Sequence, residues 1–172
     1  VRVELLKAPR FGGFREEMQH VFLVEMAIHA FDAVRHLIGE SPVAVTCTEW
    51  NPTFSWFAHG STAEAVFDFP SGVRFGFTGS WVASGFETSW NGSWRVMGER
   101  GTVLWDGESA PVRQLAGLEP EPPEPLPVTP HEIAGALVEF TDALASGGTP
   151  TGWIDENIAS LAVLEATGSV FT

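Results

Sequence analysis

Four side chains that can hold or move a proton recur at helical spacing in the segment EMAIHAFDAVRH, namely Glu25, His29, Asp32 and His36. At about 100° per residue, the last three fall within about 40° of Glu25, so all four share one narrow side of a helix. Carboxylates beside imidazoles in a cleft orient the histidine tautomer and tune its pKa towards neutrality, as general acid/base chemistry requires. The spacing therefore predicts a candidate proton-transfer site on this helix.

Two other interpretations fit the same four residues. They could form local side-chain pairs on a solvated helix edge, with no catalytic role. They could also share a metal ion, since His and carboxylates one turn apart can ligate one, although helical spacing alone supports this weakly. The other histidines, His20, His59 and His131, stand alone near loops or a helix start, and surface or capping positions account for them.

The helix that carries the four residues is predicted from His20 to Ile38. Helix formers are frequent, neither Gly nor Pro intervenes, and Gly39 supplies the stop signal expected just past a helix end. Apart from Arg35, the rest of its circumference is apolar, whereas a surface helix usually has a broad polar side. We expect most of this helix to be buried, with its polar line facing a cleft.

From residue 42 to about residue 105 the apolar period changes to two, which is typical of β-strands. Pro70, Ser71 and Gly72 mark a turn between two such runs, and Gly98 to Gly101 mark another. Short turns between successive strands favour an antiparallel sheet. Strands are expected around 3–5 and at 43–48, 63–69, 73–81, 94–97 and 102–105.

The carboxy-terminal third is predicted to be helical after an exposed connector. Residues 119–130 are proline-dense and acidic, which indicates an extended loop. Thr129, Pro130 and Glu132 have the order of an N-cap, a first-turn proline and a capping-box acid, and Gly147 closes the helix that they open. A last helix begins at Asp155. The whole pattern predicts one α+β domain over 1–172: a predominantly antiparallel open sheet with helices packed on one face.

The composition restricts the partners. Nine Lys and Arg against 22 Asp and Glu give the 172 residues a formal charge of −13, which repels nucleic-acid phosphates and anionic lipid. The single cysteine, Cys47, excludes an internal disulfide framework and a multi-cysteine zinc site, and its apolar flank suggests burial. Without a membrane-spanning run or a signal peptide at Val1, we expect a cytoplasmic protein that binds neither nucleic acid nor membrane.

The segment EMAIHAFDAVRHLIG resembles the start of the carboxy-terminal domain of the glucose-fructose oxidoreductase / inositol dehydrogenase / rhizopine-catabolism (Gfo/Idh/MocA) family. Members carry an acidic residue on this helix, His four residues later, Asp three after that, and Gly at its end. Glu25, His29, Asp32 and Gly39 match this pattern, although Glu stands where the family commonly has Asp. The hairpin VMGERGTVLW and the closing segment FTDALASGGTPTGWIDENIASLAVLEA resemble the family as well, so the likeness spans nearly the whole chain.

The resemblance implies that residues 1–172 are the substrate-binding and oligomerisation half of a two-domain oxidoreductase. The family's nucleotide-binding half seats a pyrophosphate on a G-x-G-x-x-G turn, and its catalytic Lys lies in a Glu-Lys-Pro motif. This sequence contains neither motif, and its one lysine is Lys7. NAD or NADP is therefore expected to bind the intact protein but not this chain alone, and no metal site is expected.

The same resemblance implies the chemistry and the roles. The intact protein would move a hydride between the nicotinamide and a hydroxyl carbon of a sugar, cyclitol or related polyol. His29 is the expected acid/base or hydrogen-bond partner of the reacting oxygen, with Glu25 as its catalytic neighbour. Asp32, which orients His29, and His36 are the expected substrate-binding residues. Because family members share the proton step with the missing Lys, His29 alone is not expected to suffice.

A function of a different class stays open, namely a non-catalytic protein-interaction domain that associates through its sheet. Seven Trp and 13 Phe without a Tyr provide more apolar surface than the helices of one small domain readily cover, and an open sheet face is an association surface. The two interpretations can coexist, since the family commonly forms its oligomer through this face. We therefore expect a homodimer or a larger homo-oligomer through the sheet.

Overall fold

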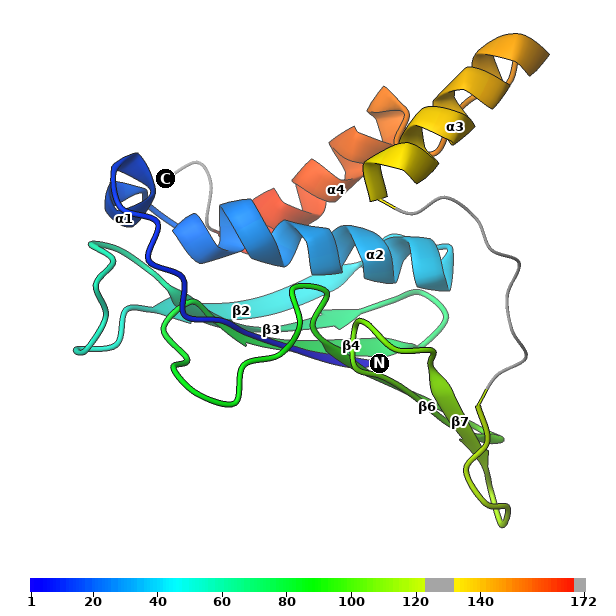
Figure 1. The fold of residues 1–172 in the computed structure, drawn as a ribbon, viewed down its shortest axis with the longest axis horizontal. Coiled ribbons are helices and arrows are strands. Elements are labelled where there is room, and N and C mark those ends of the chain that lie inside the picture. The colour runs from blue at the N-terminus through cyan, green and yellow to red at the C-terminus, as the bar shows by residue number, and fades with distance from the viewer. Residues whose placement is uncertain (123–131, 169–172) are drawn as a thin grey trace.

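The computed structural model describes residues 1–122 and 132–168, which form one sheet with the main helices on one of its faces (Figure 1). This confirms the predicted α+β fold class. The strands are β1 (Arg2–Leu6), β2 (Ala44–Trp50), β3 (Thr62–Asp68), β4 (Arg74–Ser80), β5 (Ser93–Gly98), β6 (Gly101–Trp105) and β7 (Val112–Leu115). The helical segments are α1 (Phe14–Glu17), the π-helical turn η1 (Leu23–Ala27), α2 (Ile28–Ile38), α3 (Glu132–Ser146) and α4 (Ile154–Ala166).

The seven strands follow the order β2-β3-β4-β1-β5-β6-β7. The two predicted hairpins, β3–β4 and β5–β6, are confirmed, and both are antiparallel. The amino-terminal strand β1 lies in the middle of the sheet, where it pairs in parallel with β4 and antiparallel with β5. The sheet is therefore predominantly antiparallel, as predicted, with one parallel pair. Strand β7 forms where the apolar alternation predicts none.

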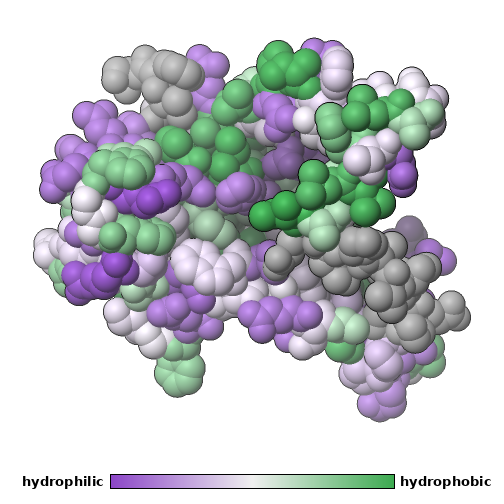
Figure 2. Space-filling view, turned by 45° about the horizontal axis from the view of Figure 1, so that its top comes forward, coloured by the Kyte–Doolittle hydropathy of each residue, from purple (hydrophilic) through white to green (hydrophobic). Residues whose placement is uncertain are grey.

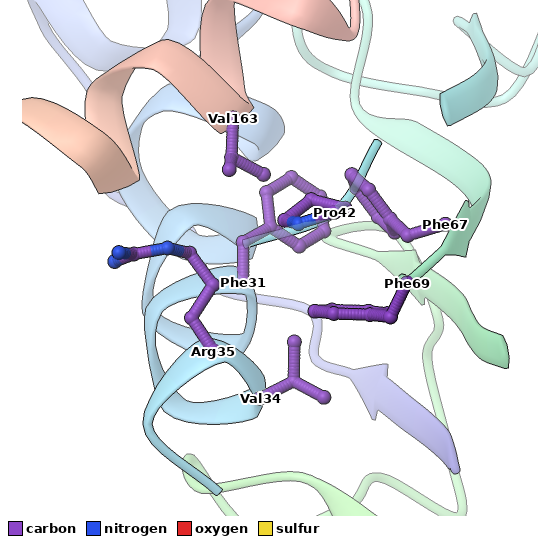
Figure 3. A pocket seen from close by; sticks show the side chains of 7 residues that line it. All are labelled: Phe31, Val34, Arg35, Pro42, Phe67, Phe69 and Val163. Carbon is purple, nitrogen blue, oxygen red and sulfur yellow. The ribbon is translucent and has the colours of Figure 1, made fainter. Parts of the chain in front are cut away.

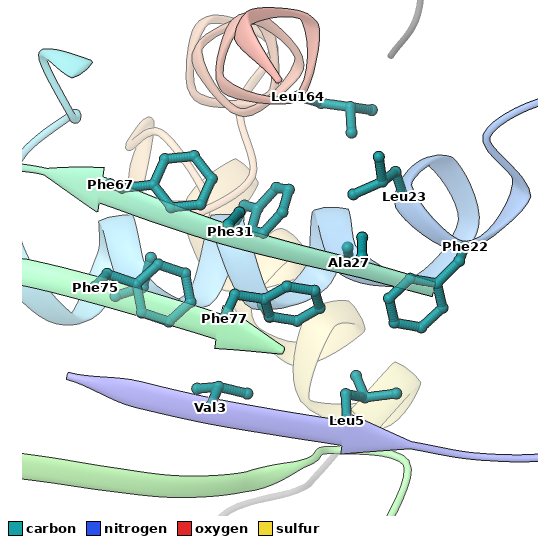
Figure 4. Packing of buried hydrophobic residues seen from close by; sticks show 14 of the residues in the cluster. Val3, Leu5, Phe22, Leu23, Ala27, Phe31, Phe67, Phe75, Phe77 and Leu164 are labelled. Atoms are coloured by element: carbon teal, nitrogen blue, oxygen red, sulfur yellow. The ribbon is translucent and has the colours of Figure 1, made fainter. Parts of the chain in front are cut away.

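The aromatic face of the sheet is the inner face, and α2 covers it. Strand pairing sets Phe67 of β3 opposite Phe75 of β4, and both side chains point to the same face because side chains alternate along a strand. Phe31 of α2 packs among them, with its ring centroid 4.8 Å from that of Phe67 and 5.2 Å from that of Phe77 (Figure 4). These rings meet edge to face, the favoured aromatic geometry, and all four are buried.

The outer face of the sheet has no helix over it in the described chain (Figure 1). Besides the ion pair of Arg74 with Asp68, four of its charged side chains form two neighbouring rows. Glu64 and Glu4 lie on either side of Thr78 in one row, and Arg2 lies beside Arg95 in the next. All four charged residues are exposed. The face thus presents negative and positive charges side by side.

The helices end largely as the sequence predicts. Gly39 follows α2 in the left-handed conformation, φ 77°, and its N–H donates to the carbonyl of Arg35. Gly147 follows α3 with φ 69°, and α4 begins one residue before Asp155. The predicted N-cap of α3 and residues 123–130 of the predicted connector lie outside the described residues.

The two carboxy-terminal helices differ in their contacts with the rest of the domain. Val163 and Leu164 of α4 are buried against the core that α2 shares, whereas α3 projects away from the sheet (Figure 1). Hydrophobic side chains gather on the upper part of the face in Figure 2, over these two helices. Within residues 1–122 and 132–168, no helix combines the length and the apolar character that crossing a membrane requires.

Candidate functional site

One side of α2 is committed to packing. Phe31 and Val34 of α2 face Phe67 of β3 and Phe69 just after it, with Val163 of α4 beside them (Figure 3). The space that these side chains enclose has no room for a water molecule. Any chemistry of α2 is therefore confined to the side that faces away from the sheet.

That free side carries His29, Asp32 and His36, all three of them exposed. They lie inside the regular part of α2, so the α-helical spacing that places them on one side applies. The polar line was expected to face a cleft, but in the described chain it is open to solvent. The reason is that the sheet packs against the opposite side of α2, while α4 meets the line only at Asp32, through Ser160.

Glu25 does not continue this line in the way that α-helical spacing predicts. It belongs to the π-helical turn η1, in which each turn takes more residues than in an α-helix, so the rule of 100° per residue fails between Glu25 and His29. The carboxylate is held instead by Arg15 of α1, whose Nε lies 2.9 Å and 3.1 Å from its two oxygens. The side chain of Glu25 is only 22% exposed.

Asp32 is tied to α4 rather than to His29. Ser160 of α4 donates its hydroxyl proton to Oδ1 of Asp32, and Nη1 of Arg35 donates to Oγ of Ser160 over 2.7 Å. Nη1 of Arg35 also lies 3.6 Å from Oδ1 of Asp32, and Nη2 donates to a carboxylate oxygen of Glu156 over 3.4 Å. Within the described residues, Asp32 makes no hydrogen bond to His29, which it was expected to orient. It accepts one from Ser160 of α4 instead.

Arg35 is the residue of this site that the sequence analysis leaves without a role. It is 9% exposed, although its charge would normally keep it in water. The signal that could have found it is its position as the one charge on an otherwise apolar arc of the helix. Nothing in the local sequence indicates its partner Ser160, which lies on a different helix.

His29 and His36 make no hydrogen bond or ion pair with any other residue that the structure describes. This sets them apart from Glu25 and Asp32, each of which is already held by an arginine. Both ring nitrogens of His29 are therefore available to a group that approaches the exposed side of α2.

His20 is not the isolated surface or capping residue that the sequence suggests. Its Nδ1 is hydrogen-bonded to Oε2 of Glu49 on β2, and its backbone has φ 52°, in the left-handed region. Glu49 also affects Cys47, which lies two residues before it on β2. Burial and, second, the charge of Glu49 raise the pKa of the Cys47 thiol to about 11. His59 is exposed in the loop between β2 and β3, and His131 lies outside the described residues.

The histidines and acids do not gather into a metal site in the part of the chain that the structure describes. Over residues 1–122 and 132–168, no group of three or more His, Cys, Asp or Glu is placed to hold a metal ion. The site offers the exposed imidazole of His29. Glu25 precedes it in the chain and Asp32 follows it, and an arginine holds each of these carboxylates. That arrangement can accept hydrogen bonds from hydroxyl groups and can transfer a proton.

Solved structures share this fold. An aldose-aldose oxidoreductase from Caulobacter crescentus, complexed with glycerol, matches with a TM-score of 0.80 and 22% identity, over 97% of this chain and 51% of that one. An oxidoreductase from Agrobacterium radiobacter in complex with NAD+, L-tartaric acid and magnesium matches with a TM-score of 0.79 and 15% identity, over 97% and 54%. A UDP-N-acetylglucosamine 3-dehydrogenase from Acidithiobacillus ferrooxidans matches with a TM-score of 0.72 and 16% identity, over 96% and 50%. The chain thus spans about half the length of these proteins.

Sequence comparison identifies the family. The "Uncharacterized protein y4oX" of Sinorhizobium fredii (strain NBRC 101917 / NGR234) is 30% identical over 97 residues, which are 56% of this chain and 27% of that protein. Residues 8–104 match the family model of the GFO/IDH/MocA C-terminal domain. This match covers more than half of the chain and includes α2 with its exposed histidines, so the chain belongs to the GFO/IDH/MocA C-terminal domain family.

Proposed function

We propose that residues 1–172 are the substrate-binding and oligomerisation domain of a nicotinamide-dependent oxidoreductase that acts on a hydroxyl carbon of a sugar, cyclitol or related polyol. The observation that carries the proposal is the exposed line of His29, Asp32 and His36 on a helix whose other side is fixed to the sheet, in a member of this family. The names of an aldose-aldose oxidoreductase and a UDP-N-acetylglucosamine dehydrogenase among the similar structures agree with a carbohydrate substrate.

In this proposal His29 is the acid/base. Its free ring accepts the proton of the substrate hydroxyl while the carbon of that hydroxyl loses a hydride. The hydrogen bond from Ser160 and the ion pair with Arg35 both use Oδ1 of Asp32, so Oδ2 remains able to accept a hydrogen bond from a second substrate hydroxyl. His36, one turn further along α2, extends the same contact surface. Glu25 acts as a fixed neighbour, since Arg15 neutralises and orients its carboxylate.

NAD or NADP is the expected hydride partner in the intact protein. A pyrophosphate cradle needs a strand, a glycine-rich turn and the N-terminus of a helix. After β1 this chain passes Gly12 and Gly13 into α1, a helix of four residues, which does not fit such a cradle. The nucleotide site of the proposal therefore lies outside residues 1–172, as does the lysine that would share the proton step. A cytoplasmic location stays a prediction.

Replacing His29 by Ala in the intact protein tests the proposal. We expect turnover of the polyol substrate to fall at least about tenfold, because a general acid/base contributes about 10²–10⁴-fold, while nucleotide affinity changes little. His59→Ala is the matched control, since this second exposed histidine lies in a loop away from α2. Equal turnover by the two variants would show that the line on α2 has no catalytic role.

The second candidate function is a non-catalytic interaction domain that associates through the outer face of the sheet. Its support is the pair of charge rows on that face, Glu4 with Glu64 and Arg2 with Arg95. When two copies pair about a two-fold axis, the acidic row of one can meet the basic row of the other. The outer face lies on the side of the sheet opposite α2, so the two functions are compatible (Figure 1).

Sedimentation velocity of the isolated chain tests this association. We expect a dimer or a larger species at micromolar protein in roughly 0.15 M salt, where the Debye length is about 8 Å and the net charge is screened. Arg95→Glu should shift the boundary towards the monomer, whereas Arg100→Glu, in the turn after β5, should not. A strictly monomeric boundary at every concentration would remove the sheet from the proposal.

A further inference from the structure

The loop between β1 and α1, with α1 itself, holds an unusual share of the positive charge of this acidic chain. Of the nine basic residues, Lys7, Arg10 and Arg15 lie within nine positions of one another. Lys7 has an acidic partner in Glu87, 3.1 Å away, and Arg15 has one in Glu25. Arg10 is exposed and has no acidic partner among the residues that the structure describes.

Arg10 is nevertheless held in place. The central carbon of its guanidinium lies 3.5 Å from the ring centroid of Trp56, a close cation–π contact. Trp56 is fixed in turn, because its Nε1 donates to the carbonyl of Pro9 over 3.0 Å. Stacking on a ring occupies the face of a guanidinium and leaves its N–H edge, which matches a carboxylate or a phosphate with two parallel hydrogen bonds. Arg10 is thus an oriented anion receptor to which none of the described residues supplies an anion.

A continuous series of contacts joins Arg10 to the helix that carries His29. Phe11 follows Arg10 in the chain, and the guanidinium of Arg15 lies 5.5 Å from the ring of Phe11 and 5.0 Å from that of Phe14. Arg15 in turn donates to Glu25 in η1, the turn that leads directly into α2. Phe11 and Phe14 are 41% and 66% exposed, so both rings beside this series of contacts are open to solvent and can pack against the apolar face of a sugar.

We infer that the substrate of this domain is an anionic polyol, which carries a carboxylate or a phosphate that Arg10 binds while the reacting hydroxyl lies at His29. The placement of the hydroxyl rests on the proposed function, whereas the anion site rests on Arg10, Trp56 and their contacts alone. Glu16, the acidic residue six positions after Arg10, is occupied elsewhere, since it accepts a hydrogen bond from the N–H of Gly12 over 3.0 Å. The aromatic and cationic surface on this loop serves to select a charged sugar over a neutral one.

Calorimetry on the intact protein with three matched probes tests the inference: D-glucose, D-gluconate and D-glucose 6-phosphate. We expect at least one of the two anions to bind about tenfold more tightly than glucose, since a charge-assisted bidentate contact is stronger than a hydrogen bond between neutral groups. Preference for gluconate alone or for the phosphate alone identifies which anion the site takes, and either result supports the inference. Equal binding of all three sugars, or binding of neither anion, overturns it.

Arg10→Gln is the variant that tests whether Arg10 is the source of this preference. It should abolish the preference for the anion and leave the affinity for glucose within about twofold, and Arg10→Lys should restore only part of the preference, because an ammonium lacks the planar fork. Arg100→Gln makes the same charge change in an exposed turn and should keep the preference. Melting temperatures identify any variant that fails to fold. If Arg10→Gln and Arg100→Gln affect anion binding alike, the preference comes from general charge and the site is not at Arg10.

These experiments distinguish a failure of the anion site from a failure of the proposed function. Turnover of a neutral polyol that depends on His29, without tighter binding of either anion, would support the oxidoreductase and refute the anion site. Anion binding that depends on Arg10, in a protein whose turnover is unchanged by His29→Ala, would support the anion site and refute the catalytic role of His29.

Discussion

Two apolar-rich helices of this domain have opposite surroundings. In α2, Phe31 and Val34 are buried against the sheet, whereas α3 leaves its large apolar side chains in solvent. A hollow of about 490 Å³ separates α3 from the segment that leads into α4, so the two carboxy-terminal helices also pack loosely on each other there. The most exposed large apolar residues of α3 are Ile133, Leu137, Phe140 and Leu144, which are 78%, 58%, 50% and 68% exposed.

The contrast teaches that an apolar helical sequence predicts the need for a packing partner but does not say where that partner lies. For α2 the partner is the aromatic face of β3 and β4 in the same chain. For α3 the described residues provide none that removes its apolar side chains from water (Figure 2). The stability of the isolated domain should therefore come from α2 and the sheet.

Substituting one Phe in each helix should give the largest difference. Phe31→Ala removes a fully buried ring that contacts three others, and we expect the free energy of unfolding to fall by about 3–5 kcal/mol. Phe140→Ala, at a position that is 50% exposed, should cost less than about 1 kcal/mol. Urea denaturation of the isolated chain measures both. Similar losses would show that Phe140 of α3 is packed as well as Phe31 of α2, and the contrast between the two helices would be wrong.

Cutting the tie between α2 and α4 should have an intermediate effect. Arg35→Met leaves Ser160 without its donor and Asp32 and Glu156 without a cation. Because the two carboxylates are 57% and 67% exposed, the loss should be about 1–2 kcal/mol rather than the 3–5 kcal/mol of a fully buried pair. Hydrogen exchange should accelerate in α4 and not in β3.

The matched control for that variant is Arg113→Met on β7. Arg113 lies 3.6 Å from Glu121, and both side chains are about half exposed, so the change in free energy of unfolding should stay below about 0.5 kcal/mol. If hydrogen exchange in α4 is unchanged in the Arg35→Met variant, apolar contacts alone, such as those of Leu164, hold this helix on α2.

At neutral pH the smallest effect concerns the thiol of Cys47, on the packed face of β2. Its pKa is raised from 9.0 to about 11, first by burial and then by the charge of Glu49. The folded chain thus binds the thiol proton more tightly than the unfolded chain, so the free energy of unfolding is unaffected below about pH 9 and falls as the pH rises from 9 towards 11. Cys47→Ser should remove that fall.

Iodoacetamide modification of the folded chain provides the direct measurement for Cys47. The rate should rise with a midpoint near pH 11, because the thiolate is the nucleophile. A midpoint near pH 9 would place the thiol in water and show that this part of β2 is less well packed than α2.

Local sequence determined those features that depend on backbone period and on residues a few positions apart. Alternation along β3 and β4 predicts the common face of Phe67, Phe75 and Phe77, and Gly39 predicts the end of α2. Spacing within one regular helix predicts the shared side of His29, Asp32 and His36. The chain-wide resemblance adds the family, which the match over residues 8–104 confirms.

Tertiary structure alone decided how the charged groups of the site are held. The π-helical turn moves Glu25 off the α-helical line and gives it to Arg15. Asp32 bonds to Ser160, 128 residues away along the chain, and Arg35 is buried between them. No period or short motif encodes such a pair, because the free energy of a hydrogen bond between distant residues depends on whether the packed helices bring its donor and acceptor together.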